Sequence, residues 1–185
     1  MNEGPQAGRL ARTPRPGVMT IAGIDPGLAR TGFGVIRGTD ERLEVLESGT
    51  IETDASWPVE QRLLVLYREL SGLFSRHSPD LVAVERLFVN RNLRSAMAVG
   101  EARGVVLLAA AEARARVVEY TPQAVKLTIT GQGQGAKQQV AYMVRHLLAL
   151  RRPLAPDEGD ALALALCGAR FSGPDRSNAP GVGRA

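Results

Sequence analysis

The feature that most constrains this chain is a short apolar segment that ends abruptly in an aspartate, a proline and a glycine. The segment is Ile21-Ala22-Gly23-Ile24-Asp25-Pro26-Gly27. Apolar residues bounded by turn formers are typical of a buried strand that ends in a tight turn. Asp25 then lies at the C-terminal end of the strand, where a carboxylate is costly unless a cation or a metal pairs with it. Taken alone, Asp25 could equally cap the turn.

The next segments predict a mixed sheet. Strands at residues 31–37 and 43–53 follow the first strand through short, turn-rich connections, which favours an antiparallel meander. A leucine stripe at helical spacing predicts a helix over residues 59–76. The apolar strand at residues 80–85 comes after this helix, so we expect it to run parallel to its neighbour through a right-handed crossover. That strand ends in Glu85, which places a second carboxylate at the edge where Asp25 lies.

The basic segment at residues 86–95 suggests contact with nucleic acid. Phe88 is flanked there by Arg91 and Arg94, and an aromatic side chain among arginines suits base stacking and phosphate contact. The alternative is that Phe88 packs back onto the core. A long helix over residues 92–114 and a fifth strand at residues 117–120 follow.

The C-terminal part of the chain adds two lysines and two more acids. Lys126 lies on a helix that starts at Pro122, and Lys137 follows a glycine-rich loop that lacks the ending of a nucleotide-binding P-loop. After a helix at residues 136–150, Asp157 and Asp160 share one face of a last, very apolar helix. They could simply cap that helix. If all four acids converge, they form an oxygen site for Mg²⁺ or Mn²⁺, and two such ions can hydrolyse a phosphodiester.

Composition sets the outer limits. The chain has 185 residues, 44% of them hydrophobic, which is enough for one core. We expect one domain over residues 19–171, with disordered segments rich in glycine, proline and polar residues at 1–18 and 172–185. A single cysteine, Cys167, excludes a disulfide framework. With no membrane span or secretory signal, we expect a cytoplasmic protein, and the net charge of +4 is compatible with a polyanionic partner.

Taken together, the motifs resemble the RuvC family of bacterial Holliday junction resolvases over roughly residues 19–170. The N-terminal extension lies outside this pattern. The matching segments, in order, are Gly23-Ile24-Asp25-Pro26-Gly27, Thr31-Gly32-Phe33-Gly34-Val35-Ile36, Val84-Glu85-Arg86-Leu87-Phe88, Gly100-Glu101-Ala102-Arg103-Gly104 and Asp157-x-x-Asp160-Ala161-Leu162-Ala163.

The resemblance implies an α/β protein with a ribonuclease H-like fold, in which a five-stranded mixed sheet, three strands antiparallel and then parallel strands, is flanked by helices. It also implies a homodimer that cuts four-way DNA junctions with Mg²⁺ or Mn²⁺, two ions per site, and works with the RuvA–RuvB branch-migration complex. Some members have histidine at the position of Asp157, so Glu158 could share its role. The residues that carry over are the metal ligands Asp25, Glu85, Asp157 and Asp160, the base-stacking Phe88, and the DNA-binding Lys126 and Lys137.

Three other readings remain at this point. A related RNA nuclease of the YqgF type shares the first motif but does not account for Phe88 in its basic loop. An actin-like ATP-binding domain would need a second lobe and a second phosphate loop, for which the chain is too short. A junction-binding scaffold without catalysis would leave the four acids without a role.

Overall fold

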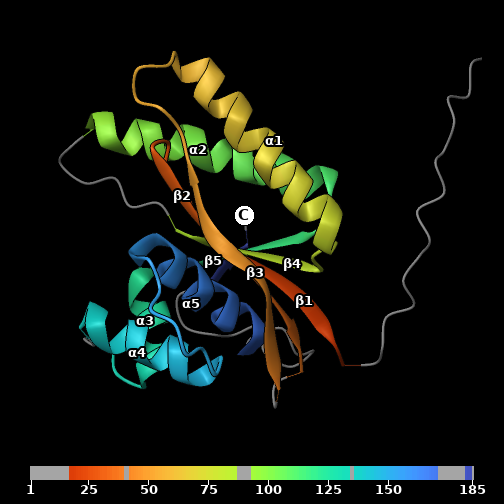
Figure 1. Ribbon diagram of the computed structural model, residues 1–185, viewed down its shortest axis with the longest axis vertical. Helices are drawn as coiled ribbons and strands as arrows, with labels where there is room; N and C mark the ends of the chain where they lie inside the picture. Colours follow the sequence, from red (N-terminus) through yellow and green to blue (C-terminus); the bar gives the residue numbers. More distant parts are fainter. Residues whose placement is uncertain (1–16, 40–41, 87–92, 134–135, 171–181, 185) are drawn as a thin grey trace, which may run out of the picture.

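The protein is built on a single mixed sheet with helices on both faces (Figure 1). The computed structural model describes residues 17–39, 42–86, 93–133, 136–170 and 182–184. In these ranges the sheet has the strand order β3-β2-β1-β4-β5-β6. The strands are β1 (Met19–Asp25), β2 (Arg30–Gly38), β3 (Leu43–Glu52), β4 (Leu81–Glu85), β5 (Arg116–Tyr120) and β6 (Val182–Arg184).

The pairing of the strands confirms the mixed sheet expected from the sequence. β1 and β2 pair antiparallel, as do β2 and β3, whereas β4 lies parallel to β1 and β5 parallel to β4. The sixth strand was not expected. β6 pairs antiparallel with the edge of β5, and its three residues come from the segment for which we expected only disorder. So short a strand, with a glycine at its centre, has no periodicity that a sequence pattern could reveal.

The helices form two separate layers. α1 (Val59–His77) and α2 (Leu93–Glu112) cover one face of the sheet, and α5 (Pro156–Arg170) covers the other (Figure 1). α3 (Pro122–Thr130) and α4 (Lys137–Leu147) pack on the outer side of α5. Within the described ranges, no helix is both long enough and apolar enough to cross a bilayer.

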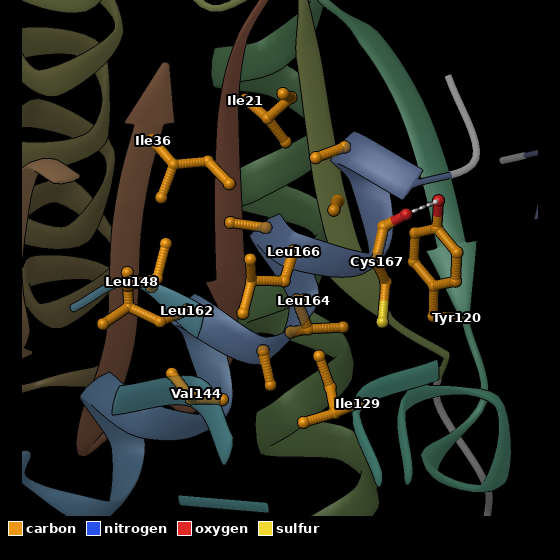
Figure 2. Packing of buried hydrophobic residues seen from close by; sticks show 14 of the residues in the cluster. Ile21, Ile36, Tyr120, Ile129, Val144, Leu148, Leu162, Leu164, Leu166 and Cys167 are labelled. Carbon is orange, nitrogen blue, oxygen red and sulfur yellow. Dashed lines mark hydrogen bonds between the residues drawn. The ribbon is translucent and has the colours of Figure 1, made fainter. Parts of the chain in front are cut away.

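α5 lies at the centre of one of the two hydrophobic cores. Leu162, Leu164 and Leu166 are all buried on it, and strand residues pack from one side and α4 residues from the other (Figure 2). A helix enclosed in this way is apolar all round instead of having one apolar stripe. Cys167 is a buried free thiol, and its carbonyl oxygen accepts a hydrogen bond of 3.3 Å from the hydroxyl of Tyr120.

Two glycines allow α5 to lie directly on the sheet backbone. A Cβ atom at Gly23 would come within 2.0 Å of the Ala161 carbonyl oxygen, and one at Gly32 within 2.0 Å of the Asp157 carbonyl oxygen. No side chain fits in either gap, which explains the glycines in β1 and β2. The backbone contacts therefore fix where the first turn of α5 lies on the sheet.

Candidate metal centre

Asp25 and Glu85 lie next to each other at the carboxyl edge of the sheet. β1 and β4 run parallel, with Ile24 paired to Val84, and each strand ends one residue later in its acid. Both acids are partly buried. The crossover inferred from the sequence therefore places two carboxylates side by side, as expected.

The first turn of α5 brings two more acids to the same place. Asp157 and Asp160 are three residues apart and therefore lie on one face of the helix. The backbone of Asp157 lies against Gly32, which is the β2 partner of Asp25. Acids from β1, β4 and α5, widely separated in the sequence, thus meet at one edge.

The carboxyl groups are close enough to perturb one another. Burial, reinforced by the charges of Glu85, Asp160 and Asp157, raises the pKa of Asp25 from 3.8 to about 7. Burial also raises the pKa of Glu85, with Asp160 adding to the shift. The pKa of Asp160 is likewise raised, chiefly by burial and then by Asp157. Carboxylates that destabilise each other's charged forms require a cation to be ionised together.

Two basic side chains from different elements flank this cluster. Lys137, at the start of α4, places its Nζ 3.7 Å from Oδ2 of Asp160, and its charge offsets part of the rise in the pKa values of Asp25, Glu85 and Asp160. Arg30, the first residue of β2, donates from Nε to Oδ2 of Asp157 at 2.6 Å. Asp157 and Asp160 are therefore each paired with one cation, and both cations reach solvent.

The donor set suits a hard divalent cation, although the side chains do not form a completed coordination shell. Among the described residues, no group of three or more Asp, Glu, His or Cys side chains is arranged to hold an ion. Asp157 is turned toward Arg30, with which it forms an ion pair. Four convergent, partly buried carboxylates nevertheless offer the oxygen ligands that Mg²⁺ and Mn²⁺ prefer.

Glu158, the neighbour considered as a substitute for Asp157, points elsewhere. It is 4% exposed, and Arg152 donates to both of its carboxylate oxygens. The hydroxyl of Ser48 donates to the same carboxylate at 2.7 Å and the backbone N–H of Ala155 at 3.3 Å. These bonds, led by the one from Arg152, hold the pKa of Glu158 below its usual range. Its bonds to Arg152, Ser48 and Ala155 make Glu158 an anchor for α5.

The residues expected to bind DNA are only partly described. Phe88 and Arg91 lie outside the described residues, as does the side chain of Arg94 in the first turn of α2. Lys126 lies half-buried on α3, and it is not among the charges that act on the carboxyl groups of the described cluster. Of the two lysines, it is Lys137 that the structure places beside the acids.

Sequence reasoning missed Arg30. Its guanidinium also pairs with Glu52, with Nη1 2.8 Å from Oε1, directly across the β2–β3 ladder. The only hint in the sequence is that Arg30 begins the strand returning from the turn after Asp25, and therefore lies at the same edge. Its contact with α5 depends on a residue 127 positions away, which no local pattern reveals.

Comparison with known proteins identifies the family to which the chain belongs. The sequence profile of the family described as crossover junction endodeoxyribonuclease RuvC matches residues 21–168. A protein of that name from Desulforamulus reducens is 46% identical over 155 residues, which covers 83% of this chain and 95% of the relative. One from Pelotomaculum thermopropionicum is 47% identical over 150 residues, covering 80% and 92%.

A solved structure agrees in three dimensions. Thermus thermophilus RuvC in complex with a Holliday junction substrate superposes with a TM-score of 0.79 at 37% identity, covering 83% of this chain and 94% of that one. The range matched by the family profile, residues 21–168, spans the strands and the helix that carry all four acids. The chain therefore belongs to the RuvC family of crossover junction endodeoxyribonucleases.

Proposed function

We propose that this protein is a structure-selective endonuclease that resolves four-way (Holliday) DNA junctions by paired symmetric nicks, in recombination and repair. The observation that carries the proposal is the convergence of Asp25, Glu85, Asp157 and Asp160 at one sheet edge, in a member of a family named for junction cleavage. Asp160 lies beside Lys137, a solvent-exposed cation that can meet a phosphate backbone.

The four acids are proposed to hold two divalent ions, Mg²⁺ or Mn²⁺. When bound, such ions activate a water molecule and stabilise the leaving oxygen of a phosphodiester. The chain's own contribution is to place the carboxylates on rigid elements, two at strand ends and two on a helix that lies on the sheet backbone. Such placement keeps the ligands in a fixed geometry without loop rearrangement.

The raised pKa of Asp25 couples ion binding to proton release. With a pKa of about 7, this carboxyl holds a proton in a large fraction of metal-free molecules at neutral pH. Metal ligation requires the carboxylate, so binding displaces that proton. We expect metal binding to weaken as the pH falls below 7, with one or more protons released per site.

DNA contacts are proposed for Lys137, Lys126, Phe88, Arg91 and Arg94. Lys137 supports this role best, because its side chain is 87% exposed and its ammonium group lies beside Asp160 at the site. A phosphate held there would lie close to the carboxylates that bind the ions. Stacking by Phe88 and phosphate contact by Lys126 follow from the family pattern, and phosphate contact by Arg91 and Arg94 follows from their place beside Phe88 in a basic segment.

A homodimer is proposed because a junction needs two symmetric cuts, and a two-fold protein presents two equivalent sites. An exposed stripe on α2 supports it. Met97 and Leu108 are 60% and 55% exposed on this helix, and a Cβ at Gly104 between them would meet no atom within 4 Å. The change Leu108→Asp should convert a dimer to a monomer in light scattering, and an unchanged mass would argue against this interface. We further propose a cytoplasmic location and cooperation with RuvA–RuvB.

The decisive experiment is cleavage of a labelled synthetic four-way junction with Mg²⁺, Mn²⁺ or EDTA. Wild type should produce paired, ligatable nicks only with metal, and Asp25→Ala should bind the junction without cutting it. Glu44→Gln, which changes an exposed carboxylate far from the site, is the matched control and should cut normally. Tight binding without cleavage under either metal would leave a scaffold, and preference for structured RNA would indicate the RNA nuclease alternative.

A further inference from the structure

Two acids of the cluster, Asp160 and Asp157, are paired with cations that come from different elements. Asp160 is flanked by Lys137 and Asp157 by Arg30, so these two acids have cations on opposite sides. Lys137 comes from α4, whereas Arg30 comes from β2 at the far side of β1. Lys137 already has a proposed role toward DNA, and Arg30 has none.

The geometry around Arg30 shows a guanidinium held at the rim of the site. Nη1 is anchored by Glu52 at 2.8 Å, and Nε donates to Asp157 at 2.6 Å. The side chain is still 50% exposed, and its two partners are 63% and 30% exposed. The group is therefore fixed by two carboxylates while it remains open to solvent and to a large ligand.

The charge balance of the cluster indicates what happens to this contact. Asp157 is expected to give its oxygen to a divalent ion, and a guanidinium 2.6 Å away is then both a competitor for that oxygen and a like charge to the ion. Glu52 lies on β3, outside the cluster, and its ion pair with Nη1 of Arg30 does not involve Asp157. Arg30 can thus lose one partner and still stay at the rim, with its Nε free to donate.

We propose that Arg30 is a second DNA-phosphate ligand, which contacts the substrate strand on the β2 side of the cluster while Lys137 contacts it on the α4 side. In the metal-free protein, the Nε–H group of Arg30 donates to Asp157, and the phosphate would accept from this same group. The inference rests on the proposed function, since it names a contact for the same substrate. A planar guanidinium anchored through one nitrogen is well suited to a phosphate oxygen at another.

The test is junction binding as a function of salt, with Ca²⁺ supplied as the oxygen-seeking cation and the DNA shown to be intact on a denaturing gel. Arg30→Gln should raise the Kd for the junction about 3- to 10-fold. It should also make the slope of log K against log salt shallower by the amount expected for the loss of about one phosphate contact. Lys137→Gln should do the same. Arg30→Lys should restore most of the slope, because it restores the charge.

Arg37→Gln is the matched control. Arg37 lies on the same strand and pairs with the exposed Glu44 at the other end, so its removal changes the net charge equally without touching the site. A residue that only orients Asp157 would leave the salt slope unchanged while weakening Ca²⁺ binding, measured by calorimetry. An unchanged slope in Arg30→Gln, or an equal change in Arg37→Gln, overturns the inference. Failure of wild type itself to bind junctions would instead refute the proposed function.

Discussion

Two acidic residues two positions apart on α5, Glu158 and Asp160, have opposite environments. Glu158 is buried, accepts hydrogen bonds from Arg152, Ser48 and Ala155, and has a lowered pKa. Asp160 belongs to a cluster of like charges, with one lysine at 3.7 Å, and has a raised pKa. The protein itself supplies the hydrogen bonds that stabilise the charged form of Glu158. The charged form of Asp160 needs a bound cation to offset its acidic neighbours. Stability and chemistry are thus assigned to different faces of one helical turn.

The largest effect on activity should come from neutralising Asp160, the acid that belongs to the proposed metal centre. Asp160→Asn keeps the shape of the side chain and removes a proposed metal ligand. Junction cleavage should fall by more than about 100-fold, the loss typical when one group that acts in the transition state is removed. Junction binding in a gel-shift assay should persist, because repulsion of the phosphates decreases. Turnover close to that of wild type would contradict the assignment of this acid.

Replacement of Glu158 should have the opposite pattern, with a loss of stability and little change in cleavage. Glu158→Gln leaves the guanidinium of Arg152 without its carboxylate partner and should lower the free energy of unfolding by about 1–3 kcal/mol. For a chain of this size that is roughly 2–4 °C in Tm per kcal/mol. Cleavage per folded molecule should stay within about twofold of wild type. The exposed pair Arg37–Glu44 gives the baseline, since Glu44→Gln should change stability by less than about 1 kcal/mol.

The pH dependence of stability should distinguish the acidic cluster, represented by Asp25, from the hydrogen-bonded Glu158. The folded pKa of Asp25, about 7, lies above its ordinary 3.8, so the folded state holds the extra proton between these values. Stability of the metal-free protein therefore falls as the pH rises from about 4 to 7, and the cost is complete above 7. Glu158 acts in the opposite sense, because its lowered pKa gives stability that is lost only as the pH falls below about 4.5.

Asp25→Asn should remove the first of these effects. In EDTA at pH 8 the variant should melt a few degrees above wild type, and the gap should narrow toward pH 5. Adding Mg²⁺ should stabilise wild type at pH 8 and the variant much less. The measurement is a set of thermal melts at several pH values with and without metal. A variant less stable than wild type at pH 8 in EDTA would show that burial does not penalise this carboxylate.

Sequence reasoning recovered the parts of the site that follow from local pattern and chain topology. The first strand ends at Asp25, as its apolar run predicted, and a right-handed crossover sufficed to place Glu85 beside it. The i, i+3 spacing put Asp157 and Asp160 on one face. Each of these inferences uses only neighbours in sequence or a general rule of connection.

What the sequence could not supply depends on contacts between distant segments. Helical periodicity cannot tell which side of α5 faces Ser48, so Glu158 remained a candidate ligand until its partners were seen. The pairing of Arg30 with Asp157 requires the lateral position of α5 on the sheet. The sixth strand of the sheet, β6 at the edge of β5, reflects an open ladder and not a local propensity.

The glycines beneath α5 have a consequence for how such an enzyme can change over generations. At Gly23 and Gly32 a single added methyl group would collide with helix backbone, not with a side chain that can turn aside. Any such replacement would lift or tilt the turn that carries Asp157 and Asp160, and so change the geometry of the proposed metal centre. The floor of the site therefore cannot vary without moving the helix above it, whereas a replacement at the rim, where Arg30 and Lys137 face solvent, changes a side chain and leaves the backbone in place.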